Sequence, residues 1–392
     1  MTCRLLALLF AFCAFSLTGQ HAASAPALDL RVQAYVNELA ILQQALIEGD
    51  RQAVTQYRER VGSVGQRIMA LPDTVFDQPA SIDAVVKYLL MGGQPRVGRR
   101  VLKILKRADR PMGLLFAATA FASGRPSLAK KWLFKFKALD APATVAGNIA
   151  LAKGLLVASK KPKAAIRHFE EALLLAPGTL IAESALRQLI SIPEIVSHAT
   201  RLRYIGSRYL MRYRASVFAT AFRRAYAAAF VELKSRSKTD NKWLLDLLKS
   251  QPAQVRSDYA IELARAALVS GKADLVAFAI KIIEPSKVAS AADKARYTFY
   301  TRAAAIIQGA AGAPSGAIDK IDSAVLSERD AELLRASKYL VKAIRERPSL
   351  DTLQASDKHN KPAQPTDQKA PQREVINQGR RVIASIDKML GQ

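Results

Sequence analysis

The sequence predicts an all-α fold: an array of helical hairpins, or α-solenoid, followed by a linker and a last amphipathic helix. Three observations predict it. Apolar residues recur at helical spacing, and no segment alternates as a β-strand does. The hydrophobic share is 50% but the aromatic share only 7%, a composition that suits closely packed helices. A weak internal repeat also runs along the chain.

Residues 1–25 are expected to form a secretory signal peptide. Arg4 supplies a positive charge, an apolar run follows over residues 5–17, and small residues then precede Pro26, which is the order typical of such a signal. The apolar run is shorter than the roughly 20 residues that a membrane-spanning helix needs. Cleavage after Ala25 and cleavage after Ala27 both fit. We therefore expect the mature protein in the periplasm.

Both cysteines, Cys3 and Cys13, lie within the expected signal peptide. A mature chain without thiols would have no disulfide, no cysteine nucleophile and no zinc–thiolate site. The alternative is a lipoprotein anchor on Cys13, against which the bulky Phe10 and Phe12 argue. Export without disulfides fits a bacterial periplasmic domain that is large enough to bury its own core.

The chain is strongly basic, with a formal net charge of +26. Because Arg4 is the only charged residue in the expected signal peptide, the mature chain would carry 26 − 1 = +25. In a cytosolic protein this balance would suggest nucleic acid as a partner. For an exported protein we expect no nucleic acid, and the anionic partners left are membrane head groups, cell-wall polymer and acidic faces of other proteins.

The expected helices follow in order within a helical-repeat domain of residues 26–345. The first places Val32, Val36, Leu39 and Leu46 on one stripe and ends near Gly49. The later helices are predicted over residues 83–91, 96–108, 112–123, 128–139, 145–159, 163–176, 181–190, 202–233, 243–249, 256–270, 274–283, 294–308 and 331–344. Short connections that carry Gly, Pro or Asp indicate antiparallel neighbours.

The internal repeat resembles the tetratricopeptide pattern, in which a small residue at a turn is followed by a small residue five positions later and then by apolar residues. This spacing begins at Gly93, Gly124, Lys160, Gly271 and Gly312; one full example is Gly124, Ala129, Leu133 and Phe136. Small residues let two helices approach, and larger ones fill the groove between hairpins. Because the spacing between units varies, we expect a degenerate array.

The last part of the chain differs in composition. Residues 346–372 contain Pro348, Pro362, Pro365 and Pro371 among polar residues, and we expect a disordered linker there. Residues 373–392 then form an amphipathic pattern. This last helix either caps the array or reaches a partner, because a flexible linker of this length has a root-mean-square span of about 25–30 Å.

No catalytic, cofactor or metal site is predicted, and we expect a binding protein rather than an enzyme. His168, His198 and His359 lack companions at metal-site spacing. The glycine-rich pieces match neither a phosphate-binding loop nor a nucleophile elbow. The pair Glu183 and Ser184 superficially resembles the motif of soluble lytic transglycosylases, but the Gly-rich segment with a Gln that follows it in that family is missing.

Two basic surfaces are the candidate partner-binding sites, with an ordinary solvated face as the alternative for each. Helical spacing places one set of cations on a single side of residues 96–110: Arg96, Arg99, Arg100, Lys103, Lys106, Arg107 and Arg110. A second set interleaves arginine with tyrosine: Arg201, Tyr204, Arg208, Tyr209, Arg212, Tyr213, Arg223 and Arg224. Arginine and tyrosine are favoured at protein interfaces.

Three segments resemble the MotC family of periplasmic motility proteins from rhizobia. They are residues 91–97 (MGGQPRV), residues 173–187 (LLLAPGTLIAESALR) and residues 209–224. The resemblance implies a role in flagellar rotation through binding the periplasmic region of the stator protein MotB, and it implies no catalytic or metal residue. The competing hypothesis is an envelope adaptor that binds cell-wall polymer or a membrane surface through charge alone.

Overall fold

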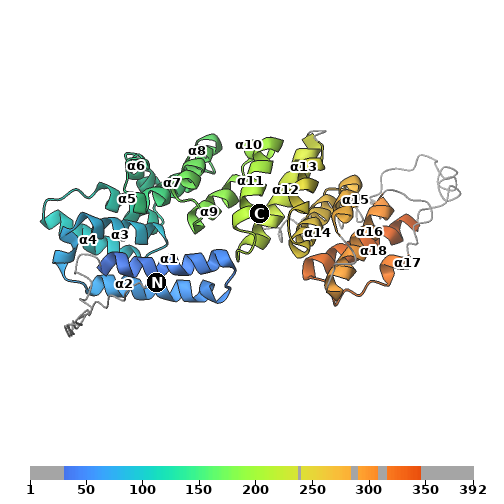
Figure 1. The fold of residues 1–392 in the computed structure, drawn as a ribbon, viewed down its shortest axis with the longest axis horizontal. Helices are drawn as coiled ribbons and strands as arrows, with labels where there is room; N and C mark the ends of the chain where they lie inside the picture. The colour runs from blue at the N-terminus through green and yellow to red at the C-terminus, as the bar shows by residue number, and fades with distance from the viewer. Residues whose placement is uncertain (1–30, 237–239, 284–289, 308–315, 346–392) are drawn as a thin grey trace, which may run out of the picture. The chain divides into compact units, whose positions relative to one another are not determined.

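The computed structural model describes residues 31–236, 240–283, 290–307 and 316–345. Within these ranges helices and turns make up the fold and no strand occurs, so the predicted all-α array of helical hairpins is confirmed (Figure 1). The expected signal peptide (1–25), linker (346–372) and last helix (373–392) lie outside the described residues. The chain divides into two compact units.

Unit 1 consists of the described residues up to Ile41 and of Tyr57–Phe136. Its elements are the first part of α1 (Arg31–Glu48), most of α2 (Gln52–Ala70), the 3-10 helix η2 (Asp73–Asp77), α3 (Pro79–Leu90), α4 (Pro95–Arg107), α5 (Gly113–Ala122) and α6 (Pro126–Leu133). Helices α3, α4 and α5 pack on one another, and α5 forms a hairpin with α6.

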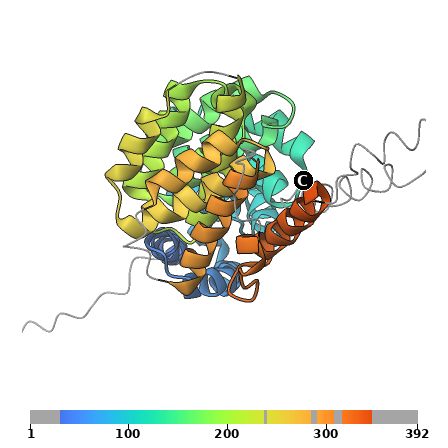
Figure 2. The same ribbon diagram turned by 90° about the vertical axis from the view of Figure 1, so that its right-hand side faces the viewer.

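Unit 2 consists of Leu42–Gln56, the turn of the first hairpin, and of the chain from Lys137 onward. Its helices are α7 (Ala143–Val157), α8 (Pro162–Leu175), α9 (Leu180–Leu189), α10 (Pro193–Val196), α11 (Ala199–Arg212), α12 (Ala219–Arg236), α13 (Lys242–Lys249), α14 (Ala253–Val269), α15 (Ala273–Ile282), α16 (Ala291–Ile307), α17 (Gly316–Asp319) and α18 (Glu328–Arg345). Neighbouring helices pair, most extensively α7 with α8 and α14 with α15. Helix α16 packs on α15, α14 and α18, in the yellow-to-red part of the chain (Figure 2).

Small residues set the distance between paired helices. A Cβ atom on Gly154 of α7 would lie 2.4 Å from the ring of Phe169 on α8. A Cβ atom on Gly206 of α11 would lie equally close, 2.4 Å, to the Tyr226 hydroxyl on α12. Only glycine permits these approaches, so large aromatic residues can pack against a neighbouring backbone. The hairpin turn at Gly271 has a positive φ of +65°, which glycine adopts without strain.

The predicted single helix over residues 202–233 is wrong. Helix α11 ends at Arg212 and α12 begins at Ala219. The Ser216 amide donates to the Tyr213 carbonyl at 3.0 Å, and the Val217 amide donates to the carbonyl of Leu46 in the first turn at 3.0 Å. The break contains neither Gly nor Pro, so no local signal marks it. Contacts with a segment distant in the sequence stabilise the turn.

Two further differences concern unit 1. Helix α2 was not predicted, because Gly62 and Gly65 weaken its helical signal. A Cβ atom on Gly65 would lie 2.4 Å from the Tyr88 hydroxyl, so the glycine is needed for packing. Helix α6 ends at Leu133, six residues before its predicted end at Leu139. None of the described helices combines the length and the apolar character needed to cross a membrane.

Candidate partner-binding surfaces

The cations predicted to form a ridge on α4 fall into two groups. Val97, Val101 and Leu105 are fully buried and attach the helix to unit 1, which leaves the opposite side to solvent. Five cations are exposed there: Arg96, Arg99, Lys103, Lys106 and Arg107. These five cations are distributed along the whole length of α4, and no aromatic side chain lies among them. This is the part of the predicted ridge that a partner could reach.

The side chains of Arg100 and Arg110 bind main-chain oxygens and stabilise the fold, so they are not available on the surface. Arg100 donates hydrogen bonds of 2.6–3.1 Å to three main-chain oxygens at the end of α2 and one of 2.7 Å to Asp73. Helix ends leave such carbonyls without partners inside the helix. Arg110 donates to the main-chain oxygen of Phe76 at 2.8 Å. Both arginines hold the segment between α2 and α3, so we remove them from the predicted binding surface.

The outer face of α11 combines arginine with exposed apolar and aromatic groups. Arg201, Arg208 and Arg212 are exposed, and among the described residues none of them forms an ion pair. Tyr204 is 49% exposed, and the Arg208 guanidinium lies 5.4 Å from the centre of its ring, within cation–π distance. We call this set, together with Met211, the α11 face.

Met211 was missed as a surface residue by the sequence analysis. It is 78% exposed and follows Arg208 by three residues and Tyr204 by seven, which places it on the same stripe. The helical spacing could have identified it. Methionine is adaptable and is favoured at binding surfaces, so the α11 face has an apolar component that α4 lacks.

The prediction was wrong for Tyr209 and Tyr213, because both side chains lie in the core of unit 2. Tyr209 is fully buried and Tyr213 is 3% exposed. The Tyr209 ring stacks on Phe222 of α12 with ring centres 3.6 Å apart, and its hydroxyl donates to Glu183 at 2.7 Å. The tyrosines that alternate with arginines in this part of the sequence therefore lie on both the inner and the outer side of α11.

Arg223 and Arg224 are held by carboxylates of α14. Arg223 lies 3.3 Å from Asp258 and its side chain is 14% exposed, so it serves packing rather than recognition. Arg224 lies 3.5 Å from Glu262 and its side chain remains 43% exposed. Of the two, only Arg224 can also contact a partner.

Glu183 does not lie in an open cleft. Its carboxyl is fully buried, and burial raises the pKa of Glu183 above its ordinary value, although nearby Tyr209 and Arg187 oppose the shift. The lytic-enzyme alternative needs a carboxylic acid that can meet a glycan, which this buried residue does not offer. Among the described residues, no three His, Cys, Asp or Glu side chains gather as a metal site would need.

Comparison with known families identifies the chain. The model of the family described as "Chemotaxis protein MotC" matches residues 1–392. The chain belongs to the MotC family. The "Chemotaxis protein MotC" of Rhizobium meliloti (strain 1021) is 25% identical over 318 residues, which cover 79% of this chain and 71% of that protein. No solved structure matches.

Membership of the MotC family confirms the resemblance seen in the sequence and gives the chain a place in motility and chemotaxis. MotC is a family of chemotaxis proteins rather than of known enzymes. The all-helical fold and the basic surfaces therefore have to be interpreted as parts of a motility protein.

Proposed function

We propose that this MotC-family chain is an accessory protein of the flagellar motor, which is exported to the periplasm and binds the periplasmic region of the stator protein MotB. The α11 face is the proposed contact surface. Family membership supports the role in motility, and the composition of residues 1–25 supports export.

The observation that carries the choice of surface is the absence of carboxylates from the stretch of sequence that contains α11. Between Glu194 and Glu232 the sequence has seven arginines and no Asp or Glu. The outward arginines are exposed beside Tyr204 and Met211. An acidic partner surface with an apolar centre would pair its carboxylates with these arginines at the rim and its apolar groups with Tyr204 and Met211 in the middle. Protein interfaces usually have such a polar rim, and most of their binding energy comes from the desolvated centre.

Such binding could regulate the motor through conformational preference. If the stator's periplasmic region has two conformations, the protein shifts their populations by as much as its affinities for the two differ. No chemical step is required of the chain, which accords with the buried position of Glu183.

The decisive experiment compares two triple charge reversals. The first replaces Arg201, Arg208 and Arg212 of the α11 face by Glu. The control replaces Arg99, Lys103 and Lys106 of α4 by Glu and changes the net charge equally. At about 0.15 M salt, where charges are screened beyond about 8 Å, the first variant should bind a MotB periplasmic fragment about 100-fold more weakly or worse. The control should change the affinity by less than about threefold.

Equal losses in the two variants would contradict the choice of the α11 face, and normal binding by both would refute the contact altogether. In cells, the α11 variant should assemble filaments but not swim. Fractionation should find the processed protein in the periplasm, and an uncleaved protein retained inside the cell would contradict the export step.

The second candidate function is an envelope adaptor, which the α4 ridge favours. Its five exposed cations have no aromatic neighbour on the same face of the helix. A surface that carries charge alone suits long-range attraction to a polyanion. Two results together would favour this function over the first. The chain would be retained on isolated cell-wall sacculi or anionic vesicles, with retention lost in the α4 triple variant, and it would not bind the MotB fragment.

A further inference from the structure

A cavity of about 300 Å³ lies in unit 2 between α12, α14 and α18. Its wall includes small and branched apolar side chains from all three helices: Ala228, Val231, Ala266, Val269 and Leu333. Val269 is 43% exposed although it is apolar. The cavity is polar at its ends and apolar in the middle, which is the usual character of a ligand site.

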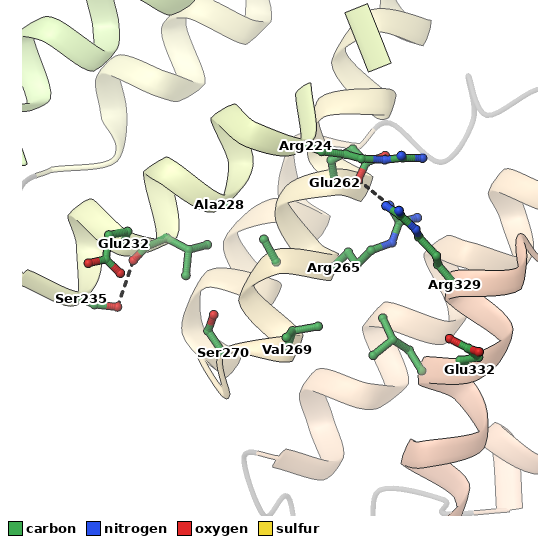
Figure 3. Close-up of a pocket in the computed structure, with 13 residues that line it drawn as sticks. Arg224, Ala228, Glu232, Ser235, Glu262, Arg265, Val269, Ser270, Arg329 and Glu332 are labelled. Carbon is green, nitrogen blue, oxygen red and sulfur yellow. Dashed lines mark hydrogen bonds and ion pairs between the residues drawn. The ribbon is translucent and has the colours of Figure 1, made fainter. Parts of the chain in front are cut away.

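One end of the cavity is rich in guanidinium groups. Arg224, Arg265 and Arg329 approach one another there beside Glu262, and a second lining carboxylate, Glu332, follows Arg329 by three residues on α18 (Figure 3). Glu262 contacts both Arg224 and Arg265, so one carboxylate is shared by two cations. Because the Arg224 side chain is 43% exposed and its contact with Glu262 is as long as 3.5 Å, it can turn toward a ligand at little cost.

A network of hydrogen bonds lies beneath this end. Asp330 is fully buried and accepts hydrogen bonds from Arg265 at 2.8 Å and 3.0 Å and from Tyr300 at 2.6 Å. Arg296 donates to the same carboxylate at 3.0 Å. These contacts join α14, α16 and α18, so the arginine end of the cavity is held in place before any ligand arrives, which lowers the entropic cost of binding.

The opposite end offers hydrogen-bond acceptors and hydroxyls. Glu232 and Ser235 of α12 lie away from the arginines, with Ser270 near the end of α14 (Figure 3). Carboxylate and hydroxyl oxygens accept from N–H groups. A ligand that suits both ends therefore has a carboxylate, an apolar group and amide N–H donors in sequence, and a peptide combines the three.

From this arrangement we infer that the cavity binds a peptide segment of a protein partner that presents an apolar side chain next to a carboxylate. The apolar side chain packs against Val231, Val269 and Leu333, and the carboxylate contacts Arg224 and Arg329. The charged and hydroxyl groups at both ends of the apolar middle argue for a peptide rather than for a long acyl chain. This inference does not depend on the identity of the partner proposed above or on the α11 face.

The test uses three capped dipeptides and the full chain without its expected signal peptide. The probe is N-acetyl-Leu-Glu-N-methylamide, compared with its Leu-Lys and Gly-Glu counterparts by ligand-detected NMR titration. A ligand of this size is expected to bind with a Kd of about 1 mM. The Leu-Glu probe should bind at least about fivefold more tightly than either counterpart, because the others lose the arginine contacts or the apolar contact.

Matched substitutions locate the binding. Ala228→Phe adds a ring at the cavity wall and should weaken the Leu-Glu probe about fivefold or more, whereas Ala221→Phe, at an exposed alanine of the same helix outside the cavity, should not. Arg224→Gln preserves the packing and should reduce the preference for Glu over Lys, because Arg329 remains at the same end of the cavity. Thermal unfolding of each variant checks the fold, and Arg224→Gln keeps the test valid if Ala228→Phe does not fold.

Three results would overturn the inference. These are no saturable binding of the Leu-Glu probe by the unaltered chain, equal affinity for the Leu-Lys probe, or binding that Ala228→Phe and Arg224→Gln leave unchanged.

Discussion

Helices α4 and α11 both carry arginines toward solvent, but the arginines have different roles. Arg100 on α4 and Arg110 just after it satisfy main-chain oxygens of the neighbouring segment, and the cations that remain on α4 have no exposed aromatic neighbour on the same face. On α11, the outward arginines make no ion pair within the described residues and flank Tyr204 and Met211. The number of charges on a helix therefore does not identify a binding surface. The groups beside the charges do.

The two sides of α11 show the same principle for tyrosine. Tyr204 points outward under the Arg208 guanidinium, whereas Tyr209 points inward, stacks on Phe222 and donates to Glu183. The residue type is the same, but the first is available for contact and the second stabilises the core. The comparison of α4 with α11, and of the outer with the inner side of α11, can be tested by substitution.

The largest expected effect concerns Arg100 of α4. Arg100→Ala should destabilise the protein by about 2–3 kcal/mol, because it removes several charge-assisted hydrogen bonds and leaves carbonyls at the end of α2 without a donor. Arg99→Ala, one residue earlier and exposed, should stay within about 0.5 kcal/mol. Urea unfolding followed by circular dichroism measures both.

If Arg99→Ala proved as costly as Arg100→Ala, the division of the α4 cations into structural and exposed groups would be wrong. The division would be supported if only Arg100→Ala lowered the stability and if the Arg100→Ala protein were still retained on sacculi or vesicles as the unaltered protein is.

The next effect separates the two tyrosines of α11. Tyr204→Ala should weaken binding to the MotB fragment about tenfold, near 1.4 kcal/mol, with little change in unfolding. Tyr209→Phe should leave that affinity unchanged and lower stability by about 1 kcal/mol, because the buried Glu183 loses its hydrogen bond. Calorimetric titration and thermal unfolding of both variants provide the measurement, and a reversal of the two outcomes would refute the assignment of the two sides.

The fold was largely predictable because its signals are local. Helical periodicity and the glycines at turns such as Gly271 act over a few residues, and the structure confirms the hairpins that they predicted. The break between α11 and α12 was not predictable, since the Val217 amide bonds to Leu46 far away in the sequence. Similarly, helix α2 was not predicted, because the packing partner that explains Gly65, Tyr88, lies on another helix.

The candidate sites were predictable only in part. Periodicity placed the exposed cations of α4 on one side of the helix, but it could not show that Arg100 is held by carbonyls, because an unpaired carbonyl has no sequence signature. The sequence analysis also assigned Tyr209 to the surface. Successive residues of a helix lie about 100° apart around its axis, so Tyr209 and Arg208 lie on different sides of α11. The cavity between α12, α14 and α18 combines side chains distant in sequence, such as Arg224 and Arg329, which no local pattern brings together.

The smallest expected effect depends on pH and concerns the inner side of α11. Because burial raises the pKa of Glu183, the folded chain binds a proton more readily at this residue than the unfolded chain does. The contribution of Glu183 to stability is therefore most favourable at low pH and declines as the pH rises from the ordinary value for Glu through the raised pKa. Above that range the folded state contains a buried, ionised carboxylate.

Glu183→Gln removes this titration while leaving an oxygen that can accept from Tyr209. The variant should gain up to about 1 kcal/mol over the unaltered protein at pH 7, and the gain should shrink as the pH falls below the raised pKa. Glu170→Gln, at an exposed carboxyl of the same unit, serves as the control and should show no such trend. Urea unfolding of the three proteins between about pH 4 and pH 8 gives the comparison, and a gain that grew toward low pH would show that Glu183 is stabilised in its ionised form.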